Sequence, residues 1–311
     1  MITSILPGTT VELKAGDRDA ELSVTGVVAM ALPLDWGDQV TVINKGDSTL
    51  YSLGYRISNA ALKLVNEVMN GAEQLILYRL NTAGVKATGT VAENVTAEAV
   101  FPGVRGNALS ITVAASGEKW LVTTYLDAVE VDSQLIATIA DFTSYYVALA
   151  GTGTLAAATV NLTGGTNGTA EADYTGFFAE LEKHEYNVVC STDATRATEV
   201  VAFVREQNAS KRYVQGVVTG IHPNYENVYV CSSTGGVTAD YELTAAEAGA
   251  TLAGLIAQAG VENSLTYHRG ITGWTDVTPK LTREQQIGKT QARHCSCCCM
   301  ALLQCSTILT A

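Results

Sequence analysis

The chain has 311 residues, of which 47% are hydrophobic and 16% charged, a composition typical of a globular protein with about two domains and a sizeable core. Its formal net charge of -12, with only 19 scattered Lys and Arg residues, argues against a nucleic-acid binder, because phosphate contacts require clustered cations. No secretory signal is evident, and the longest apolar run, residues 26–34, is far shorter than the roughly 20 residues that span a bilayer. We therefore expect a chain that folds in the cytoplasm, with Cys190 and Cys231 as free thiols.

The first quarter of the chain predicts a helix between two buried strands. Residues 20–34 form an apolar run that ends at a proline and a DWG turn. Apolar residues at helical spacing predict a helix, namely Leu62, Val65, Val68 and Met69. We expect this helix to end at Gly71. Residues 74–80, QLILYRL, are typical of a strand buried on both faces. This order indicates an α/β unit.

Residues 84–162 follow a different pattern. Short β-prone runs are separated by Gly, Asp and Ser, with no helical period between them, which predicts a β-rich module. Residues 162–169, LTGGTNGT, follow it. Backbone N–H groups in such a stretch could hold a phosphate, but the stretch matches neither GxGxxG nor GxxxxGK[ST], so we interpret it as a domain junction.

From residue 170 onward, helices and strands alternate again. Strands are predicted at 187–190 and 213–218, with Asp193 as the cap of the helix between them and a Thr244/Glu247 capping box before a last helix ended by Gly260. The three predicted helices present the following apolar residues to a core: Phe177, Phe178 and Leu181; Val200, Val201 and Val204; Leu252, Leu255, Ile256 and Ala259.

The predicted fold class is α/β (α+β), with a discontinuous α/β core domain and an inserted β-rich, barrel- or sandwich-like domain. The expected segments are an extended N-terminal arm (1–19), the first part of the core (20–83), the insertion (84–163), the second part of the core (164–287) and a Cys-rich tail (288–311).

Motifs that would indicate catalysis are missing from the sequence. There is no GxSxG, and nothing ties His184, His222, His268 or His294 to a nucleophile or an acid. The carboxylates that stand close in sequence do not divide into an acid and a base: Glu180, Glu182 and Glu185; Asp127, Glu130 and Asp132. We expect no enzyme and no cofactor.

The tail contains a cluster of metal-ligand residue types: His294, Cys295, Cys297, Cys298 and Cys299. Structural zinc sites usually combine two ligand pairs separated by a dozen or more residues, so that a folded loop encloses the ion. Here all candidate ligands fall between residues 294 and 305. A metal-binding or redox protein that uses this cluster is kept as an alternative from another functional class.

Six stretches, in order, resemble the contractile tail sheath proteins of myophages and of phage-derived injection particles. They are PGTTVEL (7–13), GVVAMALPLDWG (26–37), LILYRLNTAGVKAT (75–88), FPGVRGNALSITV (101–113), LTGGTNGTAEADYTGFFAELE (162–182) and SLTYHRGITGWTDVTPKLTREQ (264–285). The resemblance implies the same discontinuous fold and a structural role.

In that family, hexameric rings stack helically around a tail tube above a baseplate, and contraction drives the tube through the envelope of the target cell. The resemblance implies a homo-oligomer with tube and baseplate partners, without nucleic acid or membrane insertion, in the tail of a virion or phage-like particle assembled in bacterial cytoplasm. The alternative within these particles is a baseplate or other component that does not polymerise.

Terminal arms in the family add strands to a neighbouring subunit's sheet. Val11 and Leu13 alternate with polar residues and are candidates for such pairing, and Arg105 is a candidate to meet a neighbour's carboxylate. After a Thr282/Gln285 capping box and Ile287, the sequence departs from the family. A two-base frame shift of permissible codons for 299–311 can yield HGAAAVQHNINS, which resembles the family's ending. We interpret the Cys-rich tail as frameshifted, and we expect a chain with abbreviated arms to be a monomer or small oligomer.

Overall fold

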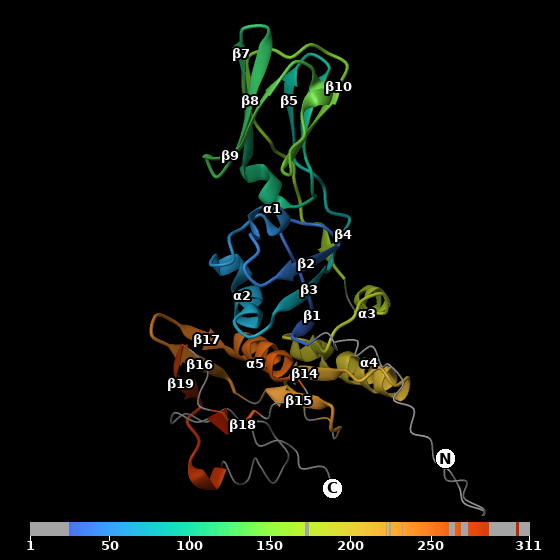
Figure 1. Ribbon diagram of the computed structural model, residues 1–311, viewed down its shortest axis with the longest axis vertical. Coiled ribbons are helices and arrows are strands. Elements are labelled where there is room, and N and C mark those ends of the chain that lie inside the picture. Colours follow the sequence, from blue (N-terminus) through green and yellow to red (C-terminus); the bar gives the residue numbers. More distant parts are fainter. Residues whose placement is uncertain are drawn as a thin grey trace, which may run out of the picture.

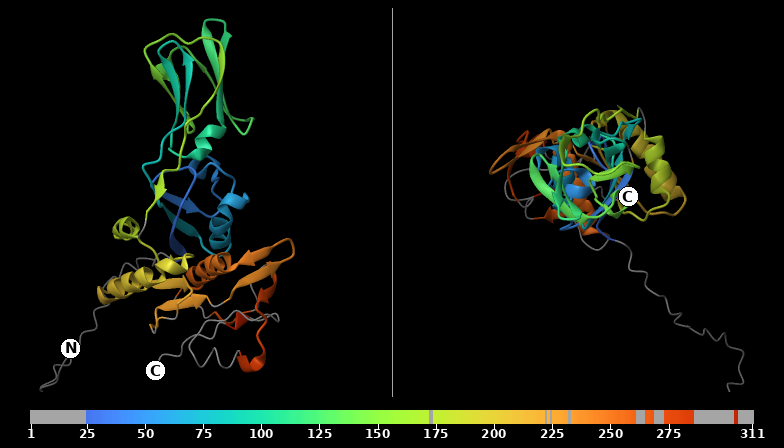
Figure 2. Two further views of the ribbon diagram at one scale, coloured as in Figure 1. Left: turned by 180° about the vertical axis from the view of Figure 1, so that it is seen from behind. Right: turned by 90° about the horizontal axis from the view of Figure 1, so that it is seen from above.

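The computed structural model describes residues 25–171, 174–221, 223, 225–231, 233–260, 265–268, 273–285 and 303–304. The described molecule is elongated, with a region of strands at one end and a region of helices and strands below it (Figure 1). Seen from behind, these regions again lie one above the other along the long axis (Figure 2). We call residues 84–163 the module and the described residues on either side of them the core.

A six-stranded sheet forms the centre of the core. Its strands, in spatial order, are β15 (Val228–Cys231), β14 (Gln215–Thr219), β13 (Val188–Cys190), β1 (Val27–Leu32), β3 (Gln74–Arg79) and β2 (Val40–Asn44). Neighbouring strands are parallel, except that β2 is antiparallel to β3. Strand β1 precedes the module and β13 follows it, yet Val28 lies opposite Val188. The prediction of a discontinuous α/β core is therefore confirmed.

Helices cover both faces of this sheet. The helices are α1 (Leu50–Leu53), α2 (Lys63–Met69), α3 (Thr175–Leu181), α4 (Ala197–Ala209) and α5 (Ala245–Ala259). Helices α2 and α5 pack on one face of the sheet, and α3 and α4 pack on the other. Because neither face meets water, β1 and β3 are almost entirely apolar, as the sequence predicted for residues 74–80.

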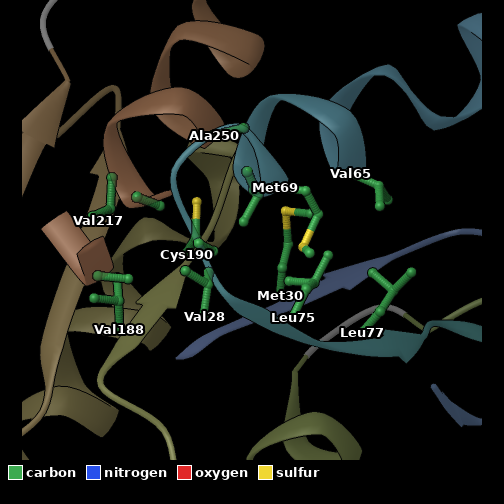
Figure 3. Close-up of a cluster of buried hydrophobic side chains, with 14 of the residues drawn as sticks. Val28, Met30, Val65, Met69, Leu75, Leu77, Val188, Cys190, Val217 and Ala250 are labelled. Atoms are coloured by element: carbon green, nitrogen blue, oxygen red, sulfur yellow. The ribbon is translucent and has the colours of Figure 1, made fainter. Parts of the chain in front are cut away.

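The first of these two faces is shown in Figure 3. Met30 and Leu75 point from the sheet toward Val65 and Met69 of α2, while Ala250 approaches from α5. Cys190 lies in the same cluster and is fully buried, and this burial raises the pKa of its thiol to about 12. Neither Cys190 nor Cys231 takes part in a disulfide in the described part of the chain, as predicted.

Gly71 directly follows the C-cap of α2, where the sequence predicted the helix to end, and it has a second role that the sequence did not indicate. It follows α2, but its φ is not in the left-handed region that a glycine helix stop would use. A Cβ at Gly71 would lie 2.5 Å from the carbonyl carbon of Gly254 in α5, and one at Gly254 would lie 2.2 Å from the carbonyl oxygen of Val68. The two glycines therefore allow α2 and α5 to approach each other closely.

A buried carboxylate strengthens the same helix contact. Glu67 of α2 is 1% exposed and accepts hydrogen bonds from the hydroxyls of Thr251 in α5 (2.9 Å) and Tyr241 (3.0 Å). Tyr241 lies between β16 (Gly235–Thr238) and β17 (Glu242–Thr244), which form a sheet with β19 (Trp274–Thr278). One carboxylate thus holds α2, α5 and this hairpin together.

The module is a β-sandwich, which agrees with the predicted insertion of strands. One sheet has the order β10 (Val147–Gly151), β6 (Val95–Ala99), β5 (Thr88–Ala92), and the other has the order β11 (Ala158–Asn161), β7 (Leu109–Ser116), β8 (Lys119–Leu126), β9 (Val129–Ile136). Two short 3-10 helices, Val104–Ala108 and Ile139–Asp141, are its helical parts. The strands enclose a hydrophobic cluster of their own.

Local signals in the second half of the core are confirmed with small corrections. The Thr244/Glu247 capping box is present, as is that of Thr282 and Gln285, which opens a helix described over residues 283–285. Asp193 caps a 3-10 helix, Ala194–Arg196, rather than α4 itself. Of the predicted inward residues of α5, Leu252 and Ile256 are buried, whereas Leu255 and Ala259 are half-buried.

Two short pairings complete the described fold. Strand β4 (Asn81–Thr82) pairs with β12 (Thr169–Ala170) where the chain leaves and re-enters the core. Strand β18 (Thr266–His268) pairs with β20 (Leu303–Gln304). None of the described helices is long and apolar enough to cross a membrane.

Candidate functional site

Arg105 lies where the module meets the core, and its whole guanidinium is engaged. It makes two bonds to the Asp127 carboxylate, of 2.9 and 2.5 Å, and its Nε donates to the carbonyl of Gly54 at 2.7 Å. The same group lies over the ring of Tyr55, 4.2 Å from its centre. Gly54 and Tyr55 belong to the core, whereas Arg105 and Asp127 belong to the module. The planar fork of arginine therefore bridges the two regions.

Asp35 is the acceptor at the centre of this contact. Its carboxylate accepts hydrogen bonds from the Tyr55 hydroxyl (3.1 Å) and from the side-chain amide of Asn167 (2.7 Å). Burial, with the Asp35 charge as the second cause, raises the pKa of Tyr55. Gly103 has a φ of 144°, and a Cβ there would lie 1.9 Å from the backbone oxygen of Asp35. The FPGVRGN loop therefore needs glycine at this position to reach the core.

Trp36 contributes an apolar contact to the same region. It precedes the module in sequence, yet its 1% exposed ring is part of the module's hydrophobic cluster. It meets Phe101 edge-on, with ring centres 5.5 Å apart, and its Nε1 donates to the carbonyl of Tyr51 at 3.1 Å. The DWG turn thus inserts a large aromatic side chain from the core into the sandwich.

The glycine-rich stretch 162–169 forms the return path at this contact. Val85 bridges to Thr166, and the side chain of Asn107 both donates to and accepts from Gly165, at 2.9 and 2.8 Å. These bonds fit the predicted domain junction. We call Asp35, Trp36, Tyr55, Arg105, Asp127, Asn107 and Asn167 the joint.

Within the joint, Arg105 bonds to Asp127, and Asp35 accepts from Tyr55 and Asn167, an arrangement that suits holding two regions in one orientation. Elsewhere, His184 lies 3.5 Å from Glu180 in an i,i+4 pair, and the bond from Lys183 lowers the pKa of Glu180. Across the described residues, no group of three or more His, Cys, Asp or Glu side chains is placed to hold a metal ion.

Several predicted site residues lie outside the described residues. They are Val11, Leu13, His222, His294, Cys295, Cys297, Cys298 and Cys299. That the terminal arms take part in assembly therefore stays a prediction. So do the two interpretations of the tail, as a metal site and as a frameshifted segment. Arg105 is described, and its partner is a carboxylate of its own chain, so a contact to a neighbour's carboxylate also stays a prediction.

A hollow that no sequence pattern indicates lies beside β2, the end strand of the six-stranded sheet. Its volume is about 360 Å³, and its lining includes Asp38, Val42, Asp47, Tyr51, Phe101 and Tyr145. The rings of Tyr51 and Tyr145 lie 5.6 Å apart across the boundary between core and module. We call it the aromatic hollow. Its members come from three distant stretches, so no local pattern could have indicated it.

Three family models match consecutive parts of the chain. They are the tail sheath protein Gp18 domain III N-terminal region (residues 25–80), the phage tail sheath protein beta-sandwich domain (82–169) and the phage tail sheath protein central domain (167–294). The second match agrees with the sandwich architecture of the module. The last match ends at residue 294, just before the cysteine run begins at Cys295.

Similarity to individual proteins agrees with the family-model matches. The Phage-like element PBSX protein XkdK of Bacillus subtilis (strain 168) is 30% identical over 303 residues, which cover 86% of this chain and 64% of that protein. The sheath tail protein of Desulfitobacterium hafniense is 33% identical, with a TM-score of 0.81 over 98% of this chain and 76% of that one. The sheath tail protein of Listeria innocua is 28% identical, with a TM-score of 0.79 over 89% and 66%. The chain thus spans 64% of the length of the curated relatives it matches.

Proposed function

Because the chain belongs to the phage tail sheath protein family, we propose that it is a structural subunit, not an enzyme, of a contractile sheath. Many copies would assemble around a tail tube and drive that tube through a cell envelope when they contract. The observation that carries the proposal is the ordered match of all three sheath regions, supported by a 33% identical sheath tail protein of the same fold. The particle would be a phage tail or phage-like element assembled in bacterial cytoplasm.

The joint suits the mechanical part of this role. A sheath that contracts by rotating and sliding its subunits needs each subunit to transmit force without deforming. Arg105, Asp35 and Trp36 tie the module to the core through charged, polar and apolar contacts at once. We propose that core and module move as one body, and that the driving energy comes from the change in packing between subunits rather than from nucleotide hydrolysis.

Assembly would also involve the chain ends. We propose that residues 1–19, with Val11 and Leu13, pair with the sheet edge of a neighbour by β-augmentation. A tail that departs from the family sequence after the end of the family-model match at residue 294 would lack the matching C-terminal strand. Tube protein and baseplate remain the proposed further partners.

A pelleting experiment tests the proposal. One sample is the chain itself, and the second carries the C-terminal segment of the D. hafniense sheath tail protein in place of residues 288–311. We expect the second to sediment as very large particles and the first to stay in the supernatant as a monomer or small oligomer. If both stay in the supernatant at high concentration, self-assembly into a sheath is contradicted for this chain.

A further inference from the structure

We propose that the aromatic hollow receives the exposed turn 211–213 of a second copy of this chain. The inference rests on the proposed function, because it concerns how copies of a sheath subunit meet. It adds a specific contact between folded surfaces, separate from the terminal arms.

The hollow combines exposed apolar area with negative charge. Val42 of the end strand β2 is 45% exposed, and Tyr145 in the same lining is 75% exposed. Asp38 and Asp47 stand in the same lining, which includes no Lys or Arg among its described residues. Each carboxylate uses one oxygen in a local backbone contact, Asp38 with Gln39 N and Asp47 with Asn44 N, so each keeps a second oxygen for a cation. Such a site favours an aromatic group next to a positive charge.

The turn between α4 and β14 presents those two groups. Tyr213 is 84% exposed, the largest exposure among the large hydrophobic side chains of the described residues. Two positions earlier, Lys211 adopts a φ of 64°, and no described carboxylate lies within ion-pair distance of its ammonium group. The next residue, Arg212, is held inward against the ring of Tyr186, 5.4 Å from its centre. Lys211 and Tyr213 are therefore left facing outward.

The turn is also held in one shape. The side-chain amide of Asn208 donates to the carbonyls of Val204 and Val214, both at 2.9 Å, and its oxygen accepts from Val214 N at 3.2 Å. The backbone N–H of Lys211 donates to the carbonyl of Asn208 at 3.0 Å. A rigid projection loses little conformational entropy when it binds, which favours its use as a contact.

Charge and shape complementarity point to a second copy as the partner. The turn is a convex aromatic projection with a free ammonium group, and the hollow is a concave aromatic site with two carboxylates. They lie in different parts of the molecule, the hollow beside β2 and the turn at the end of α4 (Figure 1). Two different surfaces that fit each other give a head-to-tail contact, which builds rings or helical stacks rather than closed dimers.

Zero-length cross-linking tests the contact directly. Equal amounts of the C-terminally completed chain, unlabelled and labelled with ¹⁵N, are mixed and treated with a carbodiimide, which joins an ammonium group to a carboxylate only when they touch. Mass spectrometry should find amides from Lys211 of one isotopic form to Asp38 or Asp47 of the other. Lys119, which lies in the module outside the lining, is the control lysine and should give no such amide. Amides from Lys211 to carboxylates elsewhere only, or none between isotopic forms, would overturn the proposal.

Substitutions at exposed positions sharpen the test without threatening the fold. Tyr213→Ala and Tyr145→Ser should each lower the yield of the Lys211 amide roughly tenfold, the effect of removing a central aromatic contact. Leu135→Ala, at another exposed apolar position, is the matched control and should leave the yield unchanged. An equal yield from all three variants would contradict the contact.

The same variants separate this inference from the proposed function. Large assemblies of the C-terminally completed chain that form equally well with Tyr213→Ala would sink this contact and leave the sheath role intact. Lys211 amides to the hollow in a C-terminally completed chain that never forms large assemblies would support the contact and count against the sheath role.

Discussion

The core and the module are stabilised in different ways. The core has a mainly parallel sheet covered on both faces, so its strands are almost wholly apolar and its stability comes from helix packing. The module is antiparallel, and β7 alternates buried and half-buried residues from Leu109 to Val113. Its cluster also includes Trp36, which belongs to the core. The hydrophobic clusters of the core consist of core residues, whereas the hydrophobic cluster of the module includes a side chain from the core.

Replacing Trp36 should give the largest effect. Trp36→Ala removes a fully buried ring from the cluster of the module, and we expect a loss of about 3–5 kcal/mol in the free energy of unfolding. Urea unfolding measures it, with the exposed Leu121→Ala as control, which should change stability by less than about 0.5 kcal/mol. A loss of less than about 1 kcal/mol for Trp36→Ala would mean that the module does not depend on the core for its interior.

Closing the gap between α2 and α5 should test the core in turn. Gly254→Ala would place a Cβ 2.2 Å from the backbone oxygen of Val68, so we expect a net loss of about 1–3 kcal/mol despite the better helix propensity of alanine. Gly249→Ala in the same helix is the matched control, because its nearest neighbour is a methyl group at 3.1 Å. The free energy of unfolding of the Gly249→Ala variant should be unchanged or slightly higher. Equal effects for both variants would show that the close contact of α2 with α5 is not limiting.

Features that depend on residues close in sequence are predicted correctly, whereas features that depend on residues far apart in sequence are missed. The Thr244/Glu247 capping box is correctly predicted because its donors and acceptors lie three residues apart. The role of Gly71 is missed because its partner, Gly254, lies far along the chain. Trp36 is missed for the same reason, since the turn it belongs to looks like a strand end.

The partners of the candidate site residues are also hard to predict from sequence. Arg105 was chosen for a contact to another subunit, yet Asp127 and Gly54 of its own chain occupy its guanidinium. No sequence pattern distinguishes a bridge within a chain from one between chains. The arm residues Val11 and Leu13 remain predictions, because they lie outside the described residues.

Arg105 sharpens the comparison at the joint, with a smaller expected effect. Arg105→Ala removes the bond to Gly54 and the stacking on Tyr55, and we expect a loss of about 1–2 kcal/mol. Asp127→Asn should cost less than about 1 kcal/mol, because Asp127 is more than half exposed and its ion pair is screened by water. A double-mutant cycle by urea unfolding separates the two terms. If Asp127→Asn costs as much as Arg105→Ala, the ion pair rather than the core contact holds the joint.

The smallest effect concerns a buried hydroxyl of the core. Burial raises the pKa of Tyr186 from 10.0 to about 12, so the fold prefers the neutral phenol. Its contribution to stability is complete below pH 10 and is lost as pH rises toward about 12, because the unfolded chain ionises first. The hydroxyl has no hydrogen-bond partner among the described residues, so Tyr186→Phe should raise stability by about 1 kcal/mol near pH 7.

Denaturation of both forms between pH 7 and 12 checks this prediction. The Phe variant should lose less stability than the parent over the alkaline part of that range. A destabilised Phe variant at pH 7 would show that the hydroxyl has a partner that matters.

Electron microscopy of the purified material shows whether this chain builds a sheath. Negative staining would compare the chain with the version that carries the C-terminal segment of the D. hafniense sheath tail protein. We expect hollow cylinders or stacked rings from the completed chain and single particles from the chain alone. Single particles from both, or isolated rings that never stack, would contradict a sheath subunit and favour a tail component that does not polymerise.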